Sequence, residues 1–187
     1  TYVELIVVLG IFAVMSAIVM YNYVEFQAKI DIKNLASDIA SKIVEAQKSA
    51  MNGKLTSRVP TVNPWKPSYG VHFNVTADNK GFTYFSDLNN NWIYDVSNCA
   101  TGECLNYIAI VKGNNYLSNI DNCTSDPCTV NSVNPLSIIF RRPDSRAIFN
   151  GASVTSSGYI QITVKSPRSS TAVGLIKIYP SGRVQVN

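Results

Sequence analysis

The N-terminal stretch constrains this chain more than any other part of its sequence. Residues 1–24 are apolar or uncharged except for one side chain, Glu4. A helix rises about 1.5 Å per residue, so this run can cross the roughly 30 Å hydrocarbon core of a bilayer. A carboxylate in hydrocarbon costs about 2.5 kcal/mol or more without a partner. We therefore expect Glu4 to pair with an α-amine, either that of Thr1 or that of a neighbouring copy.

The helix is predicted to continue beyond this apolar run. Apolar residues from Ile32 to Ala50 recur at steps of three and four, with charged residues on the other face. Asn52 and Gly53 both tolerate the left-handed conformation that ends a helix. We predict one helix over residues 1–52, about 78 Å long. Its first part, 1–24, would lie in a membrane or filament core, and the amphipathic part, 25–53, would lie on a globular domain.

The sequence after Gly53 changes its periodicity. Residues 54–68 contain three prolines and predict a connecting loop. Short alternating segments follow, as half-buried antiparallel strands require, at 69–75, 82–85, 105–111, 136–140, 147–149, 159–165, 173–179 and 183–186. The predicted fold class is α+β, with a long N-terminal helix packed on an antiparallel β-sheet domain formed by residues 54–187.

The first ten residues, T-Y-V-E-L-I-V-V-L-G, resemble the start of mature type IV pilins and type II secretion pseudopilins. That family begins F-T-x-x-E-L after a leader is removed, and its first residue is N-methylated. The phenylalanine expected before Thr1 is absent from this sequence. A secretory signal would instead begin with basic residues and end at a small-residue cleavage site. In this resemblance Glu4 neutralises the N-terminal amine of an adjacent subunit and sets register during filament assembly.

The resemblance implies a pilin-like fold and a structural role without enzymatic activity. The implied protein is a subunit of a type IV pilus or secretion pseudopilus, serving adhesion, motility, secretion or DNA uptake. Its partners would be copies of itself, other pilins, the inner membrane and the prepilin peptidase. It would lie on the bacterial surface, with a single-pass membrane precursor. Residues 68–73 and 174–184 look like the GspH/FimT group of minor pseudopilins, and a monomeric membrane-anchored binding domain remains a third alternative.

The four cysteines form two C-x4-C pairs in polar segments. Cys99 and Cys104 make one pair, and Cys123 and Cys128 make the other. Zinc sites usually have closer spacing, and no histidine is near, so we expect disulfides and an oxidising compartment. The spacing leaves three connectivities open.

An Asx-rich segment provides the candidate for a small-ion site. Asp87, Asn89, Asn91 and Asp95 place oxygen side chains at steps of two, followed by a carboxylate. This spacing resembles the first part of a calcium loop, although Trp92 stands where a glycine is usual. Calcium is therefore a possible cofactor. The alternative is a turn whose side chains bond their own backbone.

Charge and histidine content bear on the remaining functions. Residues 72–128 carry 2 basic and 6 acidic side chains, whereas residues 129–187 carry 7 and 1, which suits contact between identical subunits. The alternative function is a minor pilin that binds DNA for transformation through this basic region: Arg141, Arg142, Arg168, Lys177 and Arg183. Family members that bind DNA carry G-R-x-R, and Gln185 replaces the second arginine here. His72 is the only histidine and has no catalytic motif beside it.

Overall fold

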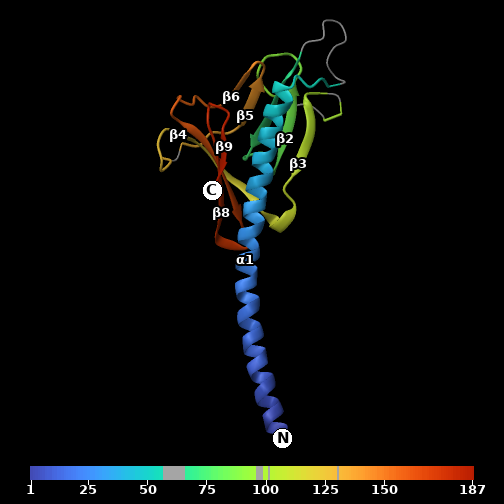
Figure 1. Cartoon of the computed structure of the whole chain (residues 1–187), viewed down its shortest axis with the longest axis vertical. Helices are drawn as coiled ribbons and strands as arrows, with labels where there is room; N and C mark the ends of the chain where they lie inside the picture. The colour runs from blue at the N-terminus through green and yellow to red at the C-terminus, as the bar shows by residue number, and fades with distance from the viewer. Residues whose placement is uncertain (57–65, 96–98, 101, 130) are drawn as a thin grey trace.

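One helix runs through the whole length of the molecule. The computed structural model describes residues 1–56, 66–95, 99–100, 102–129 and 131–187. Helix α1 spans Tyr2–Met51, which makes it about 75 Å long. Its first half projects from the β domain, with the N-terminus at the far end (Figure 1). Gly53 follows at φ 58°, so the helix predicted over residues 1–52 and its glycine stop are confirmed.

The β domain contains two antiparallel sheets beside the second half of α1 (Figure 1). The first has the order β3-β2-β1-β5-β6 and the second the order β4-β7-β8-β9. A short 3-10 helix, η1 (Lys112–Asn114), connects β3 to β4. The strands are β1 (Ser68–Asn74), β2 (Asp78–Asp87), β3 (Cys104–Ala109), β4 (Tyr116–Cys123), β5 (Leu136–Arg141), β6 (Asp144–Asn150), β7 (Tyr159–Ser166), β8 (Ser169–Ile178) and β9 (Val184–Val186). The α+β class is therefore observed.

The structure contains one strand, β4, that was not predicted. The strands form two sheets, because β4 pairs with β7 and not with β3. The two fully buried apolar side chains of β4, Leu117 and Ile120, are three residues apart, and the pairing with β7 shifts register between Leu117 and Asn119. This irregularity removes the period-two alternation by which a strand is recognised.

The apolar face of α1 forms the centre of the core. The residues of this face between 28 and 50 are almost completely buried: Ala28, Ile32, Ala36, Ile39, Ile43, Ala46 and Ala50. They pack mainly against β8 in one sheet and against β1 and β5 in the other. A buried hydrogen bond of 3.0 Å from the Tyr84 hydroxyl to Oγ of Ser49 fixes the helix against β2 as well. Helix and sheets therefore share one core.

Helix α1 packs tightly against the second sheet at Gly174 in β8. A Cβ atom at this position would lie 2.9 Å from Cγ2 of both Ile32 and Val164, and 3.3 Å from Cβ of Ala36. Such separations are too short for ordinary carbon contacts. The absence of a side chain at Gly174 thus sets the distance between helix and sheet.

We predict that Gly174→Val destabilises the domain by about 2 kcal/mol or more, because the added methyl groups overpack the contact with α1. Chemical denaturation of the chain in detergent micelles measures this loss. The matched control is Val173→Ala, on the exposed face of the same strand, which should change stability by about 0.5 kcal/mol or less. Equal effects of the two substitutions would contradict the close packing at Gly174.

Candidate functional site

The projecting half of α1 exposes a long series of large apolar side chains. The large apolar side chains from Tyr2 to Met20 are between 54% and 85% exposed. The helix is long and apolar enough to cross a membrane. Exposed apolar surface of this extent is typical of a site that contacts lipid or other protein. The interpretation of residues 1–24 as a membrane or filament segment agrees with this exposure.

Glu4 and the N-terminal amine lie together at the free end of the helix. The amine nitrogen of Thr1 donates to Oε2 of Glu4 at 3.2 Å, and both groups are at least 80% exposed. The pairing follows from helix geometry, since a side chain at the third helical position reaches back to the helix start. This contact lies within one chain, and the pairing of Glu4 with the amine of a neighbouring copy stays a prediction. An exposed pair of this kind contributes little in water and much more in a low dielectric.

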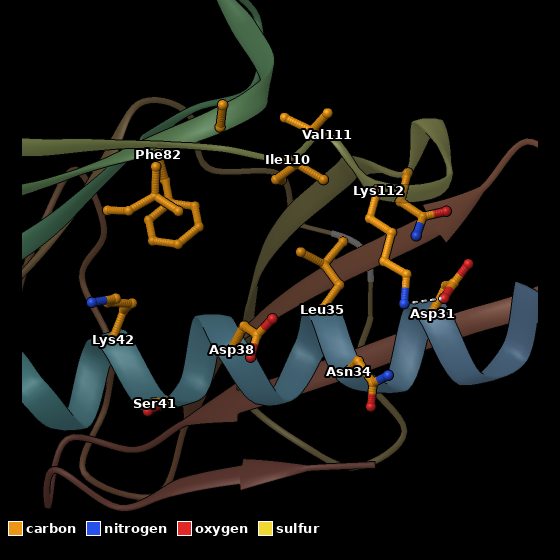
Figure 2. A pocket seen from close by; sticks show the side chains of 13 residues that line it. Asp31, Asn34, Leu35, Asp38, Ser41, Lys42, Phe82, Ile110, Val111 and Lys112 are labelled. Atoms are coloured by element: carbon orange, nitrogen blue, oxygen red, sulfur yellow. Dashed lines mark ion pairs between the residues drawn. The ribbon is translucent and has the colours of Figure 1, made fainter.

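A second acidic residue holds α1 where the helix leaves the β domain. Asp31 has a side chain only 3% exposed, and Oδ1 lies 2.9 Å from Nζ of Lys112. Figure 2 shows this ion pair at one end of a groove of about 460 Å³ between α1 and the β3–η1 segment. Arg168 approaches Oδ2 of Asp31 at 3.9 Å from the β7–β8 turn. The hydrogen bond from Lys112 lowers the pKa of Asp31, so this carboxylate remains ionised.

The Asx-rich segment forms a hydrogen-bonded turn. The two carboxylate oxygens of Asp87 accept from the backbone amides of Asn90 and Trp92 at 2.7 and 3.1 Å. The side-chain amides of Asn89 and Asn91 both donate to Oδ2 of Asp95. These contacts match the Asx-turn alternative, in which side chains bond nearby groups of the same segment.

The turn also uses a carboxylate that the sequence did not indicate. Glu103 is 5% exposed, and its two oxygens each accept a bond of 2.9 Å from the backbone amides of Leu88 and Asp95. Burial raises its pKa. The predicted calcium ligands are therefore gathered in one loop, but the oxygens of Asp87 are directed at backbone amides. Calcium binding stays a prediction.

The cysteines form two local disulfides. Cys99 bonds to Cys104, and Cys123 bonds to Cys128. The predicted disulfides are confirmed, and of the three connectivities the structure has the local one. Cys104 and Cys123 are completely buried at the ends of β3 and β4, so the expectation that all four lie in polar loops is wrong. Each disulfide ties a loop to the end of a strand.

His72 occupies a packed position between strands. Its Nδ1 lies 2.8 Å from Oγ of Ser137, its cross-strand partner in β5, and its ring centroid is 4.7 Å from that of Tyr94. Burial lowers the pKa of His72 to about 4, so the ring is neutral at pH 7. Ser137 is 4% exposed. The pair is therefore part of the sheet packing.

The basic residues considered for DNA binding lie at opposite ends of the domain. Arg168 lies near Asp31, where α1 leaves the β domain. Arg142 lies near Gly53, at the other end of the domain, because a Cβ atom added at Gly53 would collide with its guanidinium. Asp31 and Gly53 are 22 positions apart, which separates the two arginines by about 30 Å along α1. Lys177 is buried and paired with Asp126, and the Arg183 guanidinium lies 4.0 Å from the Tyr179 ring centroid. Arg141 lies over the Trp92 ring.

The structure thus brings Thr1 and Glu4 together and does not place the basic set on one surface. Sequence reasoning missed Asp31, whose position on the buried face of α1 among apolar neighbours was the available signal. It named Trp92 only as the residue that stands where a calcium loop has glycine, and it did not predict the contacts of Trp92 with Arg141 and Asn150. No protein-family model, curated protein or solved structure matches this chain.

The lowered pKa of His72 predicts a pH dependence of folding. The unfolded histidine, with a pKa near 6.5, binds a proton that the folded one excludes until about pH 4. Stability should therefore fall as the pH decreases through this interval. The His72→Gln variant, which keeps a polar partner for Ser137, should lose about 2 kcal/mol less than the unmodified chain between pH 7.5 and 4.5. Urea denaturation at both pH values tests this, and identical pH profiles would contradict it.

Proposed function

We propose that this chain is a structural subunit of a type IV pilus or a pilus-like secretion filament, assembled through the first half of α1. The observation that carries the proposal is an apolar helix, uncovered by its own domain, with a single carboxylate beside an α-amine at its free end. Before assembly the same helix would hold the subunit in a membrane.

Hydrophobic burial would provide most of the association free energy. Side chains such as Leu5, Phe12 and Ile18 are each more than half exposed in the single chain. Burial of a large apolar side chain contributes about 1.5–3 kcal/mol. In a bundle of equivalent helices these residues would pack against each other as the side chains of any helix interface do. Rigid attachment of the second half to the β domain supports such an arrangement, because each subunit presents the same helix in the same orientation.

The ion pair supplies the second part of the proposal. Within one chain, Glu4 and the Thr1 amine can interact without any partner. In a bundle, the carboxylate can exchange this amine for that of a neighbour without leaving either charge unpaired. Because a mispaired charge in a low dielectric is costly, the exchange would select one axial register among many similar apolar contacts.

The disulfides support an extracellular location. Two disulfides close short loops on the β domain, and such bonds persist in oxidising compartments. The alternative function in DNA uptake has less support, since its basic residues are divided between the two ends of the domain. A monomeric membrane-anchored binding domain would share the exposed helix, and filament formation distinguishes it.

We predict that Glu4→Gln abolishes or strongly reduces filament formation while the protein is still synthesised and inserted. The amide keeps the size of the side chain but cannot neutralise an amine. Electron microscopy of sheared surface material, with immunoblots of the membrane fraction, measures both quantities. The matched control is Glu45→Gln, which removes another exposed helix ion pair, to Lys42, and should leave filaments intact. Normal filaments from Glu4→Gln would overturn the role of Glu4, and the absence of filaments from the unmodified chain would favour a monomeric anchored domain.

A further inference from the structure

A pocket lined by apolar and charged side chains lies at the end of the β domain away from the projecting helix. Its volume is about 410 Å³, and it is formed by the β5–β6 hairpin, the turn at Trp92 and the segment at Pro180. Figure 1 shows β5 and β6 at the end of the molecule opposite the N-terminus. A Cβ atom added at Gly53 would collide with the guanidinium of Arg142, so the β5–β6 turn lies beside the C-terminal end of α1. The pocket is thus remote from the apolar helix.

The hairpin places three charged side chains on one face. Arg141 and Asp144 are cross-strand partners, and such partners project on the same side of a sheet. Arg146 follows Asp144 by two residues and therefore shares that side as well. The Arg146 backbone amide and its Nε both donate to the Asp144 carboxylate. These bonds fix Asp144 as an ionised acceptor, and they lower its pKa.

Arg141 and Arg146 both line the pocket, and each keeps donors without a protein acceptor among the described residues. Among the described residues, no hydrogen bond occupies the terminal nitrogens of Arg146 or the guanidinium of Arg141. Arg146 is 75% exposed in its side chain. A guanidinium presents donors in a planar fork that matches a carboxylate.

Trp92 forms the aromatic wall of the pocket and is held there by its backbone. Its amide donates to Asp87, and its carbonyl accepts from the side chain of Asn150 in β6 at 3.1 Å. Its φ of 61° is unusual for a bulky residue, and the residue as a whole is 39% exposed. The Arg141 guanidinium lies 4.7 Å from the ring centroid. An exposed indole in a strained, hydrogen-bonded backbone is typical of a binding position.

We propose that this pocket binds an acidic sugar unit of a polysaccharide, of the uronic acid class. The guanidinium of Arg146 donates to the sugar carboxylate. The C–H face of the sugar ring packs on the indole of Trp92, and Asp144 accepts from a sugar hydroxyl. Sugars require donors and acceptors together with an aromatic surface, and these three residues provide that combination. The inference does not depend on filament assembly, since it concerns the opposite end of the molecule.

The carboxylate in the pocket distinguishes this ligand from a nucleic acid. Asp144 can accept a hydrogen bond from a sugar hydroxyl, whereas a phosphodiester group offers it no donor. Among the described residues that line the pocket, two are basic, Arg141 and Arg146, and binding to a phosphate backbone usually uses more contacts. The test therefore includes an oligonucleotide as a competitor of the acidic sugar.

Isothermal titration calorimetry of the full chain in detergent micelles, with tetragalacturonate as the ligand, tests the proposal. We expect saturable binding with a Kd of about 1 mM or tighter, and no binding of the fully methyl-esterified tetramer. Two variants, Trp92→Gly and Arg146→Gln, should each weaken binding at least tenfold. Glycine accepts the positive φ of Trp92 and preserves the turn. The matched control is Lys165→Gln on β7, an exposed cation outside the pocket, which should change Kd less than twofold.

Each other result would overturn the proposal. Equal binding of the esterified tetramer would remove the role of the carboxylate, and unchanged affinity in Arg146→Gln would place binding elsewhere. If Trp92→Gly lowers Tm, Arg146→Gln alone decides the result, because its side chain is exposed at the surface. A single-stranded oligonucleotide of equal charge that displaces the sugar at lower concentration would assign the pocket to nucleic acid.

Discussion

The packing of the apolar face of α1 on both sheets is the interaction on which the rest of the structure depends. The two sheets share no strand, and α1 contacts β8 in one of them and β1 and β5 in the other. Residues such as Ile39 and Ile43 are completely buried between them. Loss of this face would expose the inner surfaces of both sheets, so helix and sheets form one cooperative unit.

This packing also determines how the free half of the helix is presented. A helix held over its second half by a full core cannot rotate independently of the domain. Asp31 reinforces the exit point, since it is tied to Lys112 in η1 and lies near Arg168 in the β7–β8 turn. No proline interrupts α1, the usual cause of a sharp kink. Every copy of the chain therefore presents the apolar surface and Glu4 in one fixed relation to its β domain.

Local patterns in the sequence predicted much of this fold. The long helix, its end near Gly53 and eight of the strands depend on periodicity and stop signals that lie within each segment. Strand β4 was missed because its bulge conceals the alternation. The contacts of Asp31 and Trp92 were missed for a different reason. They depend on Lys112, Asn150 and Arg141, residues far away in the sequence, and no local pattern contains such partners.

The disulfides could be predicted only in part from the sequence. Their spacing indicated disulfides but did not select a connectivity, which required the strands that place Cys104 and Cys123 at the ends of β3 and β4. The two proposed sites are far apart. Glu4 and the Trp92 pocket lie at opposite ends of a molecule whose helix alone measures about 75 Å. Groups this far apart with no shared partners contribute independently, so the assembly end and the ligand end can vary separately in sequence.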